Sequence, residues 1–243
     1  MVIPKIIHYC WFGGNPLPEE AKKCIESWKK YMPGYEIKEW NESNFDINCC
    51  AYVKEAYEAK KWAFVSDYAR FYIIYKCGGI YFDTDVEVIK SLEPILQEGP
   101  FMGLEKSNES YVAPGLGIAA NPGLGIYKEI LDFYNDRHFI SEGSIDYTTV
   151  VIYVTQILKK HGLKNKKILQ KIANINIYPA EYFCPKDYTS GELLITDNTY
   201  TIHHFSASWI TPKQRIKGKI KRILISFLGI KTTEKIIKFI KNI

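Results

Sequence analysis

The segment Gly78-Gly79-Ile80-Tyr81-Phe82-Asp83-Thr84-Asp85 joins a helix stop, a buried strand and two carboxylates. The glycine pair is typical of a helix C-terminus, and the preceding residues 62–77 are predicted as that helix. The apolar run 80–82 predicts a buried strand. In open α/β sheets, ligands bind outside the carboxyl ends of the strands. We therefore expect Asp83 and Asp85 to lie in a binding site.

Strand and helix patterns alternate on both sides of this segment. Apolar or alternating runs predict strands, and apolar residues at helical spacing predict helices. A strand, a helix and a strand come first, which is the usual opening of a parallel α/β sheet. The predicted strands are 3–9, 35–40, 80–82, 86–89, 116–120 and 200–204, and the predicted helices are 17–31, 62–77, 125–134 and 146–160.

Length and composition fit one packed domain. The chain has 243 residues, of which 47% are hydrophobic, so we expect a globular α/β domain over residues 1–212. The six cysteines show no metal-type pair spacing, and the N-terminus lacks the features of a signal peptide. No uncharged apolar run approaches the ~20 residues that cross a bilayer. These features predict a cytoplasmic protein with reduced thiols.

The C-terminal tail, residues 213–243, differs in charge from the rest. It contains ten Lys or Arg and one acid, whereas the other 212 residues contain 22 bases and 26 acids. Its apolar residues follow helical spacing, so a basic amphipathic helix on an anionic membrane surface is expected, at the inner face of the plasma membrane. A docked helix or an oligomer contact is the alternative. The acidic body argues against nucleic acid as a partner.

Two carboxylates at positions i and i+2 after a buried strand repel each other unless a cation or hydrogen-bond donors compensate. Carboxylate oxygens suit Mg²⁺ or Mn²⁺, and such ions keep coordination sites open for phosphate oxygens. Asp83 and Asp85 therefore predict a metal that carries a diphosphate. The alternative is an acidic turn that caps the next element.

Asp67 and Arg70 lie three residues apart on the predicted helix 62–77, so they share one face. Apolar neighbours indicate that this helix is largely buried. Asp67 is a candidate acceptor of hydrogen bonds from sugar hydroxyls, and Arg70 is a candidate donor to sugar or phosphate oxygens. A structural ion pair explains the two residues equally well.

The segment 203–209, His-His-Phe-Ser-Ala-Ser-Trp, offers further candidates. An imidazole suits Mn²⁺ and could complete the coordination that the acids begin. Strand alternation turns only one of His203 and His204 toward the site. A structural histidine is the alternative. Trp209 and a serine are candidate contacts to a diphosphate.

Three motifs in this order resemble glycosyltransferase family 32, whose sugar-binding region contains a DXD motif. They are the segments 3–13 (Ile-Pro-Lys-Ile-Ile-His-Tyr-Cys-Trp-Phe-Gly), 66–70 (Ser-Asp-Tyr-Ala-Arg) and 78–85, and the likeness returns at 204–209. The resemblance implies a GT-A fold, a nucleotide-sugar donor, Mn²⁺ or Mg²⁺, and transfer with retention of configuration. Bacterial members include capsular polysaccharide synthesis enzymes.

The resemblance also implies individual roles. Trp11 would stack on the donor base, Asp67 and Arg70 would hold the donor sugar, and His204 would be a metal ligand. The serine is ambiguous, because Ser206 and Ser208 flank an alanine. The predicted catalytic residues are Asp67, Arg70, Asp83 and Asp85; the donor-binding residues are Trp11, Asp67, Arg70, Tyr81, Asp83, Ser208 and Trp209; and the metal ligands are Asp83, Asp85 and His204.

The expected function is transfer of a sugar from a nucleotide-sugar, UDP-linked rather than GDP-linked, to a glycan or lipid-linked acceptor. A noncatalytic module that binds carbohydrate or nucleotide-sugar is the alternative. A glycoside hydrolase is disfavoured, because acids at i and i+2 on one turn do not naturally flank a scissile bond. Further candidates for sugar or acceptor contacts are Glu105, Asn121, Asp146, Thr148 and Thr149, with Asp146 equally explained as a helix N-cap.

Overall fold

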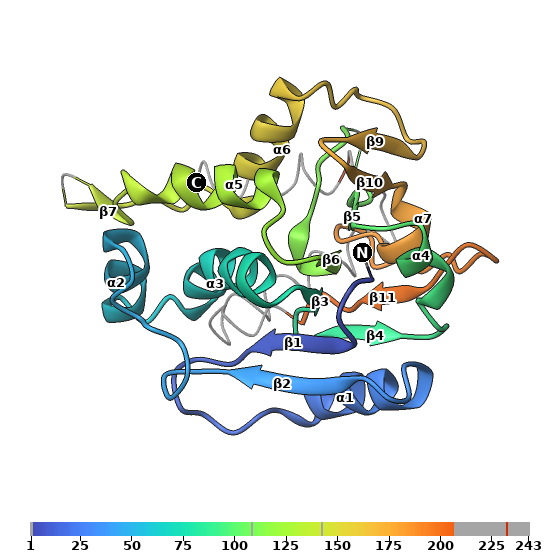
Figure 1. Ribbon diagram of the computed structural model, residues 1–243, viewed down its shortest axis with the longest axis horizontal. Helices are drawn as coiled ribbons and strands as arrows, with labels where there is room; N and C mark the ends of the chain where they lie inside the picture. The colour runs from blue at the N-terminus through green and yellow to red at the C-terminus, as the bar shows by residue number, and fades with distance from the viewer. Residues whose placement is uncertain (1, 108, 142, 207–231, 233–243) are drawn as a thin grey trace.

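The computed structural model describes residues 2–107, 109–141, 143–206 and 232. Its centre is a mixed seven-stranded sheet in the order β2-β1-β3-β6-β5-β10-β9 (Figure 1). Strand β1 pairs in parallel with both β2 and β3, whereas β6 is antiparallel to both of its neighbours. The strands are β1 (Ile6–Cys10), β2 (Glu36–Trp40), β3 (Gly79–Tyr81), β5 (Phe101–Gly103), β6 (Ile118–Ala120), β9 (Gln170–Ile172) and β10 (Ile175–Tyr178).

Seven α-helices are found in the described residues, and two short ribbons accompany the central sheet. The helices are α1 (Glu19–Tyr31), α2 (Ala51–Glu58), α3 (Trp62–Cys77), α4 (Glu93–Gln97), α5 (Gly125–Asn135), α6 (Val150–Lys160) and α7 (Ala180–Phe183), with a 3₁₀ turn η1 (Pro114–Leu116). The ribbons are β4 (Val86–Val88) with β11 (Thr201–His203), and β7 (Ile140–Ser141) with β8 (Ser144–Ile145).

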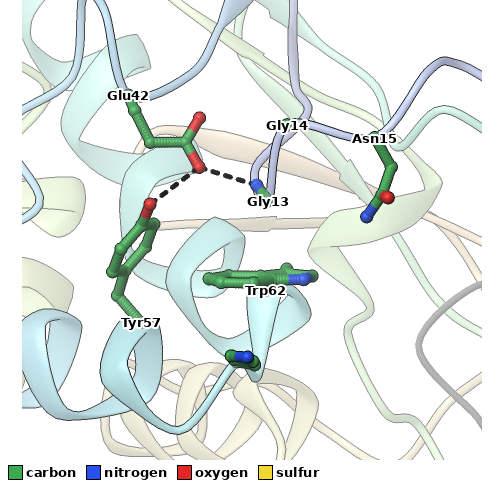
Figure 2. A pocket seen from close by; sticks show the side chains of 7 residues that line it. Gly13, Gly14, Asn15, Glu42, Tyr57 and Trp62 are labelled. Atoms are coloured by element: carbon green, nitrogen blue, oxygen red, sulfur yellow. Dashed lines mark hydrogen bonds between the residues drawn. The ribbon is translucent and has the colours of Figure 1, made fainter.

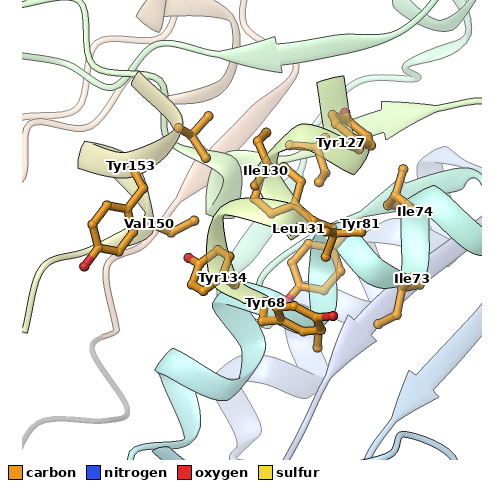
Figure 3. Close-up of a cluster of buried hydrophobic side chains, with 14 of the residues drawn as sticks. Tyr68, Ile73, Ile74, Tyr81, Tyr127, Ile130, Leu131, Tyr134, Val150 and Tyr153 are labelled. Carbon is orange, nitrogen blue, oxygen red and sulfur yellow. The ribbon is translucent and has the colours of Figure 1, made fainter. Parts of the chain in front are cut away.

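The sheet separates two hydrophobic cores, because successive strand side chains point to opposite faces. Tyr81 packs with residues of α3, α5 and α6 in one core, shown in Figure 3. Ile80 and Phe82 belong to the other core, which contains α1. There the fully buried Trp28 of α1 lies with its ring centroid 5.5 Å from that of Phe82. The predicted sheet flanked by helices is confirmed.

Helix α3 leads directly to the carboxylate segment. Its end at Cys77 is set by Gly78, which has φ +67° and donates its N–H to the carbonyl of Ile74. Gly79 has φ +94°, and a Cβ there would lie 2.6 Å from the carbonyl oxygen of Ile6. The two glycines therefore let α3 stop abruptly and let β3 lie close against β1. This arrangement fixes the position of Asp83 just after the end of β3.

Two predicted elements differ from the structure. The strand predicted at 200–204 is the shorter β11, which in the described residues pairs only with β4, antiparallel, with His203 opposite Val86. Helix α6 begins at Val150 instead of residue 146, and its N-cap is Thr149. The Asp146 carboxylate accepts hydrogen bonds from the Thr148 N–H and the Tyr153 hydroxyl, so it stabilises the turn before the helix.

The predicted tail 213–243, Ser208 and Trp209 lie outside the described residues, apart from Thr232. Within the described part of the chain, no helix is both long and apolar enough to span a bilayer.

Candidate active site

The Asp83 carboxylate lies immediately beyond β3 and is held by two neighbours. Arg70 Nη2 is 3.0 Å from Asp83 Oδ1, and the Tyr81 hydroxyl donates to the same oxygen at 3.1 Å. The Asp83 N–H donates to the Gly115 carbonyl at 3.3 Å, which ties this residue to η1. One oxygen, Oδ2, is left for a further ligand, and the side chain keeps 28% of its surface exposed.

Asp85 lies two residues further along the turn and is held from the other side by β11. His203 Nε2 is 3.2 Å from Asp85 Oδ1, and the Ser206 N–H donates to Asp85 Oδ2 at 2.7 Å. The backbone carbonyl of Asp85 also accepts the His204 N–H at 2.9 Å. The pairing of β11 with β4 thus brings an imidazole to the second carboxylate.

The histidine at the acidic pair is His203, whereas the resemblance predicted His204. The Nε2 atom of His204 lies 2.8 Å from Glu87 Oε2, away from Asp85. The reason is strand alternation: His203 ends β11 opposite Val86, so its side chain and that of the next residue turn in different directions. The structure therefore brings His203, and not the predicted His204, to the acidic pair.

Arg70 connects the carboxylates of Asp83 and Asp67. Its Nη2 atom is 3.0 Å from Asp83 Oδ1 and 3.1 Å from Asp67 Oδ1. The Arg70 and Asp67 side chains are only 5% and 12% exposed, so both charges lie in the protein interior. A buried guanidinium needs such partners, because an unpaired charge there is costly. The two residues that the sequence placed on one face of α3 do form an ion pair.

The pKa values of the acids differ with their surroundings. Burial raises the pKa of Asp67 to about 6 and also raises that of Asp83, in each case against the opposing charge of Arg70. For Asp85 burial acts in the same direction, but the charge and hydrogen bond of His203 bring its pKa down to about 2. Burial lowers the pKa of His203, yet Asp85 raises it overall.

These groups open into one cleft of about 550 Å³. Its wall includes residues of the loop after β1, of α3, of β3 and the β3–β4 turn, of η1 and of β11, and the predicted site residues in it come from the first three of these regions. Six predicted residues line it, namely Trp11, Asp67, Arg70, Tyr81, Asp83 and Asp85. These six residues lie together in the structure, and the roles assigned to them stay predictions.

A smaller hollow of about 530 Å³ adjoins this cleft and shares Asn15 and Trp62 with it. Figure 2 shows how the glycine loop after Trp11 is held there: Glu42 Oε1 accepts the Gly13 N–H at 2.6 Å and the Tyr57 hydroxyl at 3.1 Å. Gly13 has φ +95° and lies against the indole of Trp62. The loop that carries Trp11 into the cleft is thus fixed at its base.

The rest of the cleft wall was only partly foreseen. Glu105 and Thr149, two of the candidate contacts, line it, whereas Asn121, Asp146 and Thr148 are not among its lining residues. Gly115, Tyr188 and Phe205 line it and were not singled out from the sequence. Gly115 has no side chain that could suggest a role from the sequence, yet a Cβ there would collide with the Asp83 carboxylate. Only the three-dimensional approach of η1 to the β3–β4 turn reveals this role.

The residues present fit a divalent metal ion. Asp83, Asp85 and His203 each offer one ligand atom, and these atoms lie within 4.8 Å of one another. Two carboxylate oxygens and an imidazole form a donor set that suits Mn²⁺ and, less well, Mg²⁺. The buried Nδ1 atom of His203 has no hydrogen-bond partner among the described residues. These three side chains would hold the ion.

One stretch of the chain matches a known protein family. Residues 18–102 match the family model described as the glycosyltransferase sugar-binding region containing a DXD motif. The Asp-Thr-Asp turn and α3 both lie inside the matched residues. The predicted resemblance to a DXD glycosyltransferase family is confirmed.

Similar proteins and structures agree with this match. The chain is 33% identical over 102 residues to inositol phosphoceramide mannosyltransferase 3 of Schizosaccharomyces pombe, covering 39% of this chain and 27% of that protein. It is 31% identical over 112 residues to an uncharacterized glycosyltransferase of Acanthamoeba polyphaga mimivirus, covering 42% and 41% of the two chains. It thus spans less than half of the length of these relatives.

The structure of the PaToxG glycosyltransferase superposes with a TM-score of 0.55 and 21% identity, covering 65% of this chain and 69% of that one. The chain has the GT-A fold, as the sequence predicted.

Proposed function

We propose that this protein is a metal-dependent glycosyltransferase that passes a sugar from a nucleotide-sugar donor to an acceptor hydroxyl. One observation carries the proposal: two carboxylates and an imidazole converge at the end of β3, in the cleft that also contains the Asp67–Arg70 pair. A noncatalytic carbohydrate-binding surface has no need of such a concentration of buried charge.

Each group in the cleft has a task in this reaction. Arg70 and Tyr81 fix the orientation of the Asp83 carboxylate, and His203 with the Ser206 N–H fixes that of Asp85. The metal, when bound, neutralises charge that develops on the departing nucleoside diphosphate. Both carboxylates are already in place, so little reorganisation is needed when the donor arrives.

Donor recognition involves the walls of the cleft. The indole of Trp11 offers a flat apolar face for a base. Asp67 accepts hydrogen bonds from sugar hydroxyls, and Arg70 donates to sugar or phosphate oxygens. Ser208 and Trp209 are proposed to contact the diphosphate. UDP as the nucleotide, retention of configuration, and a role in surface or capsular polysaccharide synthesis follow from the family resemblance alone.

The acceptor is proposed to be a glycan or a lipid-linked saccharide, and the basic tail is proposed to hold the enzyme at the inner face of the plasma membrane. Charge reversal of Lys217, Lys219 and Lys221 in the full chain should then weaken binding to vesicles that contain an anionic lipid. Unchanged vesicle binding would remove the tail from the proposal.

The test is release of nucleoside diphosphate from a panel of UDP- and GDP-sugars, with Mn²⁺ and with EDTA. Asp85→Asn should abolish release, whereas Glu87→Gln, two residues further along and outside the cleft lining, should leave it unchanged. Melting curves should show both variants folded at the assay temperature; Asp85→Asn keeps the side-chain volume but loses the ion pair with His203, so some loss of stability is expected in that variant alone.

Release that survives both EDTA and Asp85→Asn would refute metal-dependent transfer. Tight, metal-dependent binding of a nucleotide-sugar without turnover, in the presence of a range of saccharide acceptors, would identify a binding module instead. Calorimetry with free UDP and GDP distinguishes these outcomes.

A further inference from the structure

The segment that follows the cleft-lining start of α6 is unusually basic. Between Asp146 and Glu181 the sequence contains six lysines and no acidic residue. All six are exposed, and none forms a salt bridge with another described residue. They are Lys159, Lys160, Lys164, Lys166, Lys167 and Lys171.

Two aliphatic side chains stand exposed among these lysines. Ile168 is 56% exposed and Leu169 is 53% exposed, directly after Lys166 and Lys167. By contrast, the aliphatic side chains on either side of the loop, Leu163 and Ile172, are buried. We call residues 159–171 the basic-aliphatic surface.

The loop at the centre of this surface is held in place by its own hydrogen bonds. The Gln170 side chain accepts the Lys164 N–H at 2.9 Å and donates to the carbonyls of Lys164 and Lys166 at 3.0 and 3.1 Å. Asn165 accepts the Ser110 N–H at 2.9 Å, which attaches the loop to the body of the domain. The hydrogen bonds therefore hold the loop with its aliphatic pair exposed, and the loop loses little conformational entropy when it binds a partner.

We propose that the basic-aliphatic surface binds an anionic phospholipid bilayer, with Ile168 and Leu169 inserted at the headgroup–acyl boundary and the lysines contacting lipid phosphates. The lysines account for attraction to any polyanion. The adjacent aliphatic pair favours a lipid surface over single-stranded nucleic acid, because bases stack on aromatic side chains and residues 159–171 contain no Phe, Tyr or Trp. An acidic protein partner is disfavoured too, because a charged protein surface would not give Ile168 and Leu169 a hydrocarbon environment.

The position of the surface relates it to the cleft. Helix α6 begins at Val150, which lines the cleft, and ends at Lys160, which belongs to the surface. Its 11 residues span roughly 16 Å. Binding through this surface would hold the cleft within about one helix length of the bilayer. The inference does not depend on the proposed reaction, because it rests on residues outside the cleft and outside the tail.

The experiment is co-sedimentation of the full chain with phosphatidylcholine vesicles, with and without phosphatidylglycerol. Each lysine near an anionic surface contributes about 1 kcal/mol, which is about fivefold in partitioning, so Lys166→Glu/Lys167→Glu/Lys171→Glu should weaken binding roughly a hundredfold. The matched control reverses the exposed Lys23, Lys30 and Lys54 of α1 and α2, with the same change in net charge. The control should bind nearly as wild type.

Two more variants test insertion itself. Ile168→Ser/Leu169→Ser should lower partitioning roughly tenfold while leaving the charge unchanged. Ile168→Trp should show a blue-shifted fluorescence that brominated phosphatidylcholine, mixed with phosphatidylglycerol, quenches. The side chains are exposed, so these variants should keep the wild-type melting temperature.

Partitioning that is unaffected by the triple reversal, or lowered equally by the control, would overturn the proposal. Retained vesicle binding with loss of binding to single-stranded RNA would assign the surface to nucleic acid and overturn it as well. Release of nucleoside diphosphate in vesicle-free buffer should be unchanged in every one of these variants, so failure here is separate from failure of the proposed reaction.

Discussion

Gly115 is the residue whose replacement tests the geometry of the site most directly. A Cβ built on Gly115 would overlap Asp83 Oδ2, lie 3.1 Å from Asp83 Cγ and lie 3.7 Å from Arg70 Nη1. Gly115 does not have a positive φ, so alanine is compatible with the backbone, and the effect of Gly115→Ala is confined to this collision. The Asp83 backbone cannot withdraw freely, because its N–H is bonded to the Gly115 carbonyl.

The carboxylate must therefore rotate away from its bonds to Arg70 and Tyr81, by about 1 Å at the oxygen that faces the cleft. A misplacement of this size costs about 10²-fold in rate, which is ~2.7 kcal/mol of transition-state stabilisation. Overpacking adds about 1–3 kcal/mol of lost stability. We expect kcat/KM for donor hydrolysis to fall about a hundredfold, with a weaker apparent affinity for Mn²⁺.

The assay is release of nucleoside diphosphate over a range of Mn²⁺ concentrations, alongside a melting curve in EDTA. The control is Gly125→Ala, because nothing lies within 4 Å of a Cβ at Gly125 at the start of α5. That variant should be fully active and at least as stable as wild type. Wild-type activity in Gly115→Ala, with both proteins folded, would show that Asp83 does not act from the position described here.

Three further outcomes follow from the same geometry. His203→Ala should abolish Mn²⁺-dependent release of nucleoside diphosphate, whereas His204→Ala should not. The Mn²⁺ affinity of the wild type should weaken as the pH falls, because His203 must lose its proton to bind the ion; titration calorimetry at several pH values checks this affinity. His8 is buried, accepts the Trp40 indole N–H, contacts the Gly78 carbonyl, and has its pKa lowered to about 4 by burial. The unfolded chain therefore takes up a proton below pH 6.5 that the folded His8 does not, so His8 alone should remove about 3 kcal/mol of the free energy of unfolding between pH 6.5 and 4. Asp67, with its pKa raised to about 6, acts in the opposite direction over the same range, so the contribution of His8 is the difference between wild type and His8→Gln in urea titrations at several pH values. Glu105→Gln should reduce transfer to an acceptor more than hydrolysis of the donor, since Glu105 lines the cleft and is not one of the three metal-ligand candidates; equal losses in both assays would contradict an acceptor role.

The sequence was most informative where a short segment contains its own structural signal. The glycine pair and the apolar run 80–82 predicted the end of α3, strand β3 and a site at Asp83. Helix α3 was predicted with its observed bounds, because its apolar residues and its glycine stop are local features. The Asp67–Arg70 pair was expected from helical spacing and lies as expected.

Features that depend on contacts between distant segments were not predictable in the same way. Whether β11 pairs in the main sheet or beside it is decided by β4, far away in the chain. Which of His203 and His204 lies beside the acidic pair is decided by the register of that pairing, which the resemblance does not contain. Gly115 could not be recognised from sequence because its function is to leave space for another residue's side chain.

The contact between β11 and the β3–β4 turn also affects how the protein folds. Ser206 and Asp85 are bonded although 121 positions separate them in the chain. A metal ion held by Asp83, Asp85 and His203 would join segments nearly as far apart in the chain, and it would stabilise the folded state by mass action because only that state brings the three ligands together. Metal binding would then report that β11 has docked, and a chain still emerging from the ribosome would remain unable to bind its donor until β11 is in place.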